Sequence, residues 1–220
     1  MINISDLMDC KTLTVPFVAD PDWVRQYNDP SHKIACDNGW AGLRAGVDAS
    51  FVISYNNDAV QIIFTTKGAP LICNHFANQE AVCQDSCVEF FVQPPGDGRY
   101  INFEFNILGY VNASRRYGRA DAEHLTADEI ASIKREAVYR ADEPFEFYDL
   151  EDDTWILTVT IPWRLIGVVP EPGMVLKANF QVCSDSARPP YYLSWSPIAT
   201  EKPDFHRPEF FGEIILGDPS

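Results

Sequence analysis

Two glutamates of this chain, Glu89 and Glu104, have the residue type and the spacing to bind a polyhydroxylated ligand. They lie within residues 85–106, where two runs of alternating polar and apolar residues flank a cluster of two prolines and two glycines. This pattern predicts a β-hairpin. If Val92 pairs with Ile101, Glu89 lies opposite Glu104. Carboxylates set beside amides and aromatic rings on a rigid sheet are suited to binding a sugar.

The predicted hairpin separates into two faces. One face is apolar and suits a protein core. The other carries the two glutamates together with Asp85, Cys87, Phe91, Tyr100, Asn102 and Asn106. We therefore take Asp85 and Asn106 as further candidate ligand-binding residues. A shift of one residue in the register would reverse the faces and remove the argument.

The two carboxylates need an opposite charge or a ligand, because like charges directly opposite on a sheet are unfavourable. Lys177, at an outward position of a later predicted strand, is one candidate cation. Arg115, in the basic cluster Arg115, Arg116 and Arg119, is another. If such a cation neutralises both carboxylates, no ligand is required.

The same pair raises the alternative of a glycoside hydrolase. Glutamates opposite each other on a β-ladder have Cβ atoms about 5 Å apart, near the carboxyl separation of about 5–5.5 Å in retaining glycosidases. The chain has no nucleophile elbow, no HExxH and no Gly-rich phosphate loop, and its four histidines are spread singly. Binding without catalysis is therefore the favoured interpretation.

Trp195 is the candidate stacking platform, because an indole can lie against the C–H face of a sugar ring. It belongs to the run Tyr191–Ser196, which predicts a strand. A strand tryptophan is also commonly a core residue, because its large ring buries much apolar area. Both interpretations stay open from the sequence.

Alternating runs separated by turn residues predict at least seven strands and little helix, which is typical of an all-β, antiparallel β-sandwich. The capping box Thr126–Glu129 predicts one short helix. Residues 108–127 are expected to form a long irregular connection. Besides the hairpin, the predicted strands are residues 51–55, 60–66, 155–161, 175–183, 191–196 and 211–216.

The chain is expected to form one domain over residues 1–220, because no change of composition and no Ser/Gly-rich linker divides it. Residues 1–50 are expected to be an irregular segment packed on that domain. Trp23 and Trp40 lie in this segment and are expected as lids over an edge of the sandwich. The aromatic and proline-rich segment 205–212 is expected to dock the last strand, with His206 and Arg207 as possible rim residues.

The formal net charge of −15 argues against nucleic acid and anionic membrane surfaces as partners, and it is compatible with a neutral ligand or a cation. None of the six cysteines forms a CxxC pair. Cys83 and Cys87 without a histidine cluster are weak evidence for zinc, so no metal ligand is assigned. Buried thiols are expected, with one or two disulfides as the alternative.

The N-terminal residues show no basic region followed by an apolar one, and no run approaches the length of a membrane span. The sequence as given therefore predicts a soluble, cytoplasmic protein without membrane insertion. A leader removed from it would make the protein secreted or periplasmic. The oligomeric state is not predicted.

Several motifs resemble the family 9 carbohydrate-binding modules, and above all the stand-alone family 9-like proteins of gut Bacteroidetes. The resemblance covers roughly residues 50–216. It is carried by Val82–Val92, Asn102–Asn106 with Gly109, Asn179–Gln181, Leu193–Trp195 and Pro203–Gly212.

The resemblance implies an immunoglobulin-like β-sandwich that binds sugars, often the ends of plant polysaccharides, in a slot between two tryptophans. It implies structural calcium in some members. Glu89 matches the family's acidic sugar-contacting position, and Trp195 matches the C-terminal tryptophan of the slot. Cys83 replaces the other slot tryptophan, which predicts weaker stacking or a different ligand. A structural or partner-binding sandwich, whose polar face is only solvated, is a third possibility.

Overall fold

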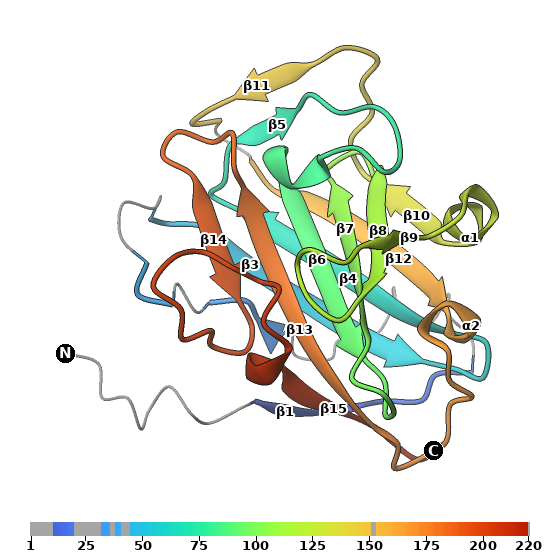
Figure 1. Cartoon of the computed structure of the whole chain (residues 1–220). Helices are drawn as coiled ribbons and strands as arrows, with labels where there is room; N and C mark the ends of the chain where they lie inside the picture. Colours follow the sequence, from blue (N-terminus) through green and yellow to red (C-terminus); the bar gives the residue numbers. More distant parts are fainter. Residues whose placement is uncertain (1–10, 20–31, 36–37, 41–44, 151–152, 220) are drawn as a thin grey trace.

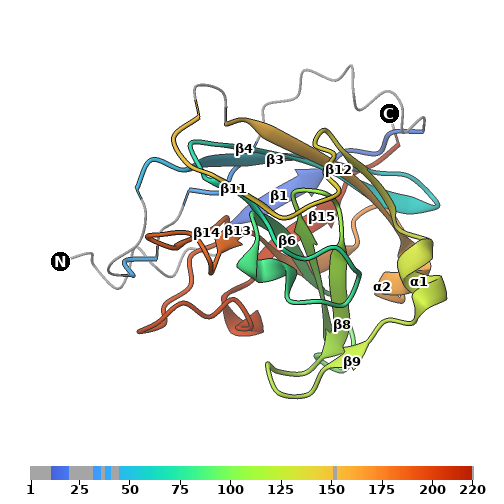
Figure 2. The ribbon, with the colours of Figure 1, turned by 90° about the horizontal axis from the view of Figure 1, so that it is seen from above.

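The computed structural model describes residues 11–19, 32–35, 38–40, 45–150 and 153–219. Within them two sheets pack face to face, as Figures 1 and 2 show. The larger sheet runs β1 (Thr12–Val15), β15 (Gly212–Leu216), β13 (Val175–Ser184), β6 (Cys87–Gln93), β7 (Tyr100–Asn106), β8 (Val111–Arg116) and β9 (Glu123–His124), with β14 (Tyr191–Ser194) also paired to β13.

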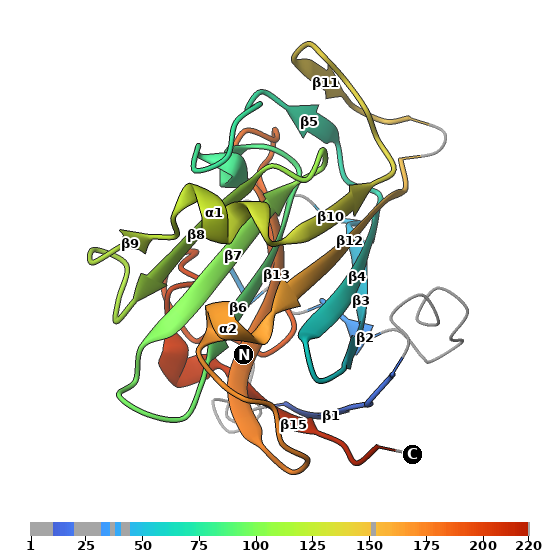
Figure 3. The same cartoon turned by 90° about the vertical axis from the view of Figure 1, so that its right-hand side faces the viewer.

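The second sheet lies across the core from the larger one, and Figure 3 shows the two edge-on. Its order is β10 (Lys134–Ala137), β12 (Trp155–Pro162), β4 (Ala59–Lys67), β3 (Asp48–Tyr55) and β2 (His32–Lys33). A separate small ribbon pairs β11 (Phe145–Phe147) with β5 (Leu71–Cys73). Neighbouring strands are antiparallel except β1 and β15, which are parallel. The predicted all-β antiparallel sandwich is confirmed.

The main core lies between the two sheets and is built from the inward residues of both. Phe51 of β3 stacks on Phe180 of β13 with ring centroids 3.7 Å apart, and Phe90 of β6 stacks on Phe180 at 5.1 Å. All three rings are fully buried. Burial of each such side chain stabilises the fold by roughly 1.5–3 kcal/mol. The Phe51–Phe180 stack joins the two sheets, whereas Phe90 and Phe180 lie opposite each other on neighbouring strands of the larger sheet.

The predicted hairpin is confirmed with its register. Val92 lies opposite Ile101, and Glu89 lies opposite Glu104. The apolar face enters the core as expected. The polar face is not solvated, however, because a second apolar cluster covers part of it. That cluster contains Trp40, Val82, Cys87, Phe91, Tyr100, Cys183, Ile198, Phe205 and Phe211.

Two short α-helices are present among the described residues, where one was predicted. The capping box of α1 (Ala127–Ala131) is confirmed: the Glu129 amide donates to the Thr126 hydroxyl, and the Glu129 carboxylate accepts from the Thr126 amide. The second helix, α2 (Trp163–Ile166), follows Pro162 and ends at Gly167, whose φ of 86° favours glycine. Two 3₁₀ turns, η2 (Val82–Gln84) and η3 (Pro208–Phe210), complete the helical structure described.

Two predictions about irregular segments were wrong. Residues 108–127 contain β8 and β9, because Val111 and Ala113 alternate inward against β7. Residues 1–50 contribute β1, β2 and the start of β3. Trp23 lies outside the described residues. No helix in the described part of the chain is long and apolar enough to cross a membrane.

Candidate functional site

Four polar side chains form a row across the outer face of the larger sheet. Gln181 of β13 lies opposite Glu89 of β6, Glu89 lies opposite Glu104 of β7, and Glu104 lies opposite Asn112 of β8. Both glutamates are nearly buried, with 2% and 5% of their surface exposed. The fold therefore holds two carboxyl groups side by side on adjacent strands.

Glu104 is fixed by amides on both of its oxygens. Asn102 Nδ2 donates to Oε1 at 2.8 Å, and Asn112 Nδ2 donates to Oε2 at 3.2 Å. Asn102 is itself oriented by Arg116, whose Nε donates to its Oδ1 at 2.8 Å. Burial raises the pKa of Glu104 above 4.5, while Asn112, Arg116 and Asn102 counteract that rise.

Glu89 has weaker partners. Its Oε1 lies 3.2 Å from Cys183 Sγ and 4.0 Å from Cys87 Sγ, and its buried Oε2 has no hydrogen-bond partner among the described residues. Burial, followed by the charge of Glu104, raises the pKa of Glu89 well above 4.5. Glu89 therefore holds a proton more readily than an ordinary glutamate.

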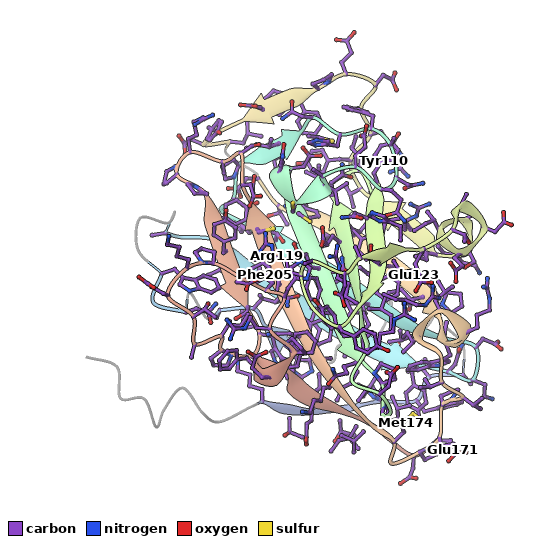
Figure 4. The ribbon with its side chains drawn as sticks, in the orientation of Figure 1. Tyr110, Arg119, Glu123, Glu171, Met174 and Phe205 are labelled. Carbon is purple, nitrogen blue, oxygen red and sulfur yellow. The ribbon has the colours of Figure 1, made fainter. Side chains whose placement is uncertain are left out.

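A hollow of about 160 Å³ opens over these carboxyl groups. Arg119 lines it from the loop between β8 and β9, and Asp204 from the segment between β14 and β15. Arg119 Nη1 donates to Asp204 Oδ1 at 3.1 Å. In Figure 4 Arg119 lies beside Phe205, which lines the same hollow, in front of the larger sheet. The hollow thus combines carboxyl groups with a cation and an aromatic ring.

Three aromatic rings stand together on one side of the hollow. Tyr192 and Phe205, which both line it, meet edge to face with centroids 6.1 Å apart. Trp40 packs behind them, 6.4 Å from Tyr192 and 6.0 Å from Phe205. Trp40 and Phe205 are buried, whereas Tyr192 is partly exposed. Its hydroxyl donates to Asp185 Oδ1 at 2.7 Å. Tyr192 is therefore the ring available to a ligand.

His206 lines the hollow, as the sequence suggested for a rim residue. Its Nδ1 lies 2.9 Å from the Tyr100 hydroxyl, and burial lowers the pKa of its imidazole to about 4. The ring is therefore neutral near pH 7. Arg207, the other suggested rim residue, lies outside the hollow's lining and pairs with Glu209.

The assignment of Trp195 as a stacking platform is corrected by the structure. Only 4% of its surface is exposed. Its indole packs edge to face on Phe180 at 5.6 Å and on Phe51 at 6.1 Å, in the core between the sheets. With its ring enclosed by protein, Trp195 has no free face for a sugar.

Asp85 and Asn106 are also corrected, because they bind the protein itself. Asp85 is fully buried and accepts hydrogen bonds from the amides of Asn74 and His75 and from Asn106 Nδ2. Asn106 accepts in turn from the amides of Leu108 and Tyr110. The two side chains clamp the ends of neighbouring loops and do not line the hollow.

The structure places the two expected cations elsewhere. Lys177 is exposed on β13, four residues before Gln181, so it lies about 13 Å along the strand from the glutamate row. Arg115 points to the other side, where Nη2 donates to Glu129 Oε1 at 2.7 Å. Arg119, from the same predicted basic cluster, is the cation that reaches the hollow.

Sequence reasoning missed Asp185, Tyr192 and Asp204 as lining residues. Each lies in or beside a loop, and their convergence on the hollow depends on long-range packing of β14 and the following segment. The sequence predicts the strand Tyr191–Ser196, but its candidate ligand-binding residue is Trp195 and not Tyr192. The available signal was the alternation of β13 and β14, because Tyr192 lies opposite Cys183, two residues from the predicted outward Gln181 and on the same face.

A larger hollow, with a volume of about 730 Å³, lies elsewhere, beside α2 and the β3–β4 turn. Its tryptophan, Trp163, is buried, and the Nε1 of its ring donates to the Asn56 carbonyl. It brings together none of the sequence-predicted residues. We therefore place the candidate site over Glu104 despite the smaller volume there.

The structural calcium implied by the resemblance stays a prediction. Calcium takes six to eight oxygen ligands. The described residues hold one close group of three His, Cys, Asp or Glu side chains, formed by Cys87, Glu89 and Cys183. Two of its three ligands are sulfur, which does not suit calcium.

An all-β sandwich with fixed carboxyl groups and a partly exposed aromatic ring at a hollow has the architecture and the polar groups of a carbohydrate-binding module. The sequence comparison agrees. The chain belongs to carbohydrate-binding family 9, whose sequence pattern matches residues 30–216. A search of the curated proteins finds no match.

Solved structures show the same fold. A Bacteroides uniformis protein proposed to bind carbohydrate is 29% identical, with a TM-score of 0.85 over 94% of this chain and 100% of that one. A family 9 module from Caldicellulosiruptor kristjanssonii in complex with glucose is 14% identical, with a TM-score of 0.62 over 96% and 97% of the two chains. A family 9 module from the same organism in complex with cellotriose is 14% identical, with a TM-score of 0.58 over 96% of this chain and 95% of that one.

Proposed function

We propose that this chain binds the end of a carbohydrate, such as a plant-type oligosaccharide or polysaccharide terminus, non-covalently in the hollow over Glu104. Family 9 membership supports carbohydrate as the ligand class, and similar modules were solved with glucose and cellotriose. A hollow of about 160 Å³ is smaller than the roughly 300–1,000 Å³ of pockets for drug-sized ligands, so it suits one ring.

The observation that carries the proposal is the fixed Glu104 carboxyl group at a hollow shared with Tyr192 and Arg119. A carboxylate accepts from sugar hydroxyls, and a guanidinium donates to them. The exposed part of the Tyr192 ring offers a surface for C–H groups. Glu89, which is less exposed, is a second hydroxyl acceptor within this arrangement.

Calorimetric titration with glucose and cellotriose tests the proposal. Glu104→Gln is expected to weaken binding at least tenfold, because hydrogen bonds to charged groups contribute about 1.5–3 kcal/mol. Tyr192→Ala is expected to weaken binding as well, because it removes the ring that offers a surface for the C–H groups of the sugar. Lys177→Ala, which changes an exposed residue of the same sheet away from the hollow, is the matched control and should bind like the parent. Equal binding by all folded variants would contradict the proposal.

If neither sugar binds the parent, a glycan array extends the search to other termini. An array without hits, together with a tight dimer in light scattering, would favour the partner-binding alternative over carbohydrate binding.

A glycoside hydrolase is the second candidate, supported by the two adjacent carboxyl groups with raised pKa values. Raised carboxyl pKa values are typical of general acids in glycosidases. Turnover of an aryl glycoside that is lost in both Glu89→Gln and Glu104→Gln would favour this candidate. Sugar binding without turnover would exclude it for the sugars tested.

A further inference from the structure

Cys87, Cys183 and Glu89 bring three potential metal ligands together on the outer face of the larger sheet. Cys87 of β6 lies directly opposite Cys183 of β13, and Glu89 follows two residues later on the same face as Cys87. One ligand atom from each residue lies within 4.8 Å of the other two. Each of the three side chains has 2% or less of its surface exposed.

Hydrogen bonds within the protein satisfy this cluster poorly. Thiols are weak hydrogen-bond donors, and the two nearest Glu89 Oε1 lie at 3.2 and 4.0 Å. Glu89 Oε2 is buried and has no partner among the described residues, and neither does the side-chain amide of the neighbouring Gln181. A buried polar group without a partner is costly, so each instance needs an explanation.

We propose that Cys87, Cys183 and Glu89 form a binding site for a thiophilic divalent cation of the zinc type, with a further coordination position facing the hollow. Two sulfur ligands and one carboxylate oxygen are a donor set that zinc uses, whereas calcium and magnesium take oxygen ligands. The hollow, which Glu89 and Cys183 line, gives access to the site.

Charge balance is consistent with a bound cation. Zinc binds cysteine as the thiolate, so the thiol protons must leave when the ion enters the site. A divalent ion would displace these protons and offset the carboxylate charge that Glu89 shares with Glu104. Binding should therefore release about two to three protons per ion.

The rival arrangement is a disulfide between the two opposed cysteines, which are free thiols in this structure. Both arrangements would use the same sulfur atoms. Keeping the protein reduced with a phosphine separates them, because a disulfide is then absent and only ion binding can be observed.

Titration of the reduced, metal-free full chain with Co²⁺, followed by displacement with Zn²⁺, tests the site. We expect one ion per chain with an ultraviolet thiolate-to-cobalt charge-transfer band. Cys87→Ser and Cys183→Ser should each remove the band and weaken binding at least tenfold. Glu89→Gln should weaken binding while keeping both thiols. Cys73→Ser is the matched control. Cys73 is also buried, but its Sγ lies 3.7 Å from Asp85 Oδ2 and does not belong to the proposed site.

The absence of a charge-transfer band in the parent would overturn the proposal. A band that persists in both Cys87→Ser and Cys183→Ser would also overturn it, because other thiols would then hold the ion. A Cys87–Cys183 disulfide that resists reduction would do the same. Circular dichroism checks that each serine variant is folded. If a serine variant does not fold, Glu89→Gln still tests the site, because it should weaken ion binding while keeping both thiols.

The ion site and the carbohydrate site can fail independently. Ion binding is measured without sugar, and Glu104→Gln should keep the cobalt spectrum while weakening sugar binding. A parent that binds sugar but no ion would refute only the metal site. A parent that binds the ion but no sugar would refute only the carbohydrate proposal.

Discussion

Glu89 and Glu104 lie directly opposite each other on β6 and β7, buried on the same face of the larger sheet. Amides and Arg116 stabilise the charged form of Glu104, whereas Glu89 faces two thiols. When the pair takes up one proton, that proton therefore resides mainly on Glu89. The two carboxyl groups have the same chemistry, but their surroundings raise the pKa of Glu89 more strongly than that of Glu104.

Replacing the protonated member of the pair should stabilise the protein at high pH. The pKa of Glu89 is raised in the folded state, so the folded protein binds more protons than the unfolded chain above about pH 4.5, and stability falls as pH rises from there through the folded pKa. Glu89→Gln is neutral at every pH. It should unfold at a higher urea concentration than the parent at pH 8, because the folded parent must either keep a proton or bury a charge there.

The same comparison at pH 4.5 provides the control for Glu89→Gln. At this pH the folded parent is neutral at position 89 and the unfolded parent only half ionised, so the difference in unfolding free energy should be much smaller than at pH 8. A stability difference that is constant from pH 4.5 to pH 8 would contradict the assigned protonation. The measurements require metal-free protein, since a bound ion would also stabilise the parent.

The capping glutamate of α1 should show the opposite pH dependence. Arg115 and the Thr126 amide hold the pKa of Glu129 down to about 2 from 4.5. Its contribution to stability is therefore present above pH 4.5 and is lost as pH falls through about 2. Glu129→Gln should cost about 1 kcal/mol at pH 7 in urea unfolding.

A matched substitution checks the Glu129 prediction. Glu143→Gln alters an exposed glutamate and should leave stability within about 0.5 kcal/mol of the parent. If Glu129→Gln and Glu143→Gln behave alike at pH 7, the ion pair with Arg115 contributes nothing measurable.

The buried Asp85 should be a stability residue and not a ligand residue. Asp85→Asn keeps the size of the side chain but directs an NH₂ group at the amide donors of Asn74, His75 and Asn106. We expect a loss of about 2–3 kcal/mol in unfolding free energy, because a buried donor is left facing donors. Sugar affinity of the folded variant should be unchanged. Asp142→Asn, at an exposed position, is the control.

The local pattern determined the strands and the register of the hairpin, since the alternation of Val88, Phe90 and Val92 allows one face only to enter the core. Glu89 and Glu104 were therefore placed correctly relative to each other. The sequence could not show what covers the outer face. Trp195 and Tyr192 lie three residues apart near β14, and only long-range packing decides that the first is enclosed and the second stays partly exposed.

The same limit explains the cysteines. Cys83 and Cys87 are close in sequence and suggested a weak zinc motif, but the thiol that joins Cys87 is Cys183, almost a hundred residues later. Strand pairing between β6 and β13 brings these two thiols together. Sequence spacing carries no signal for such a pair. The order of the strands in a sheet, and their register across a long connection, cannot be read from the residues next to each cysteine.

Gly212, where the β-strand β15 begins, should not accept even a methyl group. A Cβ atom there would lie 2.5 Å from the Lys11 carbonyl oxygen and 2.6 Å from the indole carbon Cζ3 of Trp195. Because one of these atoms belongs to the backbone of the segment that leads into β1, the clash cannot be relieved by a side-chain rotation alone. Gly212→Ala should therefore lower the unfolding free energy by about 1–3 kcal/mol in denaturant titration.

Gly118→Ala is the matched control for Gly212→Ala, since its added Cβ would meet nothing closer than Asp121 Oδ1 at 3.9 Å. This variant should stay within about 0.5 kcal/mol of the parent. An equally harmless Gly212→Ala would contradict the close packing of Trp195 against the first residue of β15. The enclosed indole, on which the exclusion of Trp195 from the carbohydrate site depends, would then have to be reconsidered.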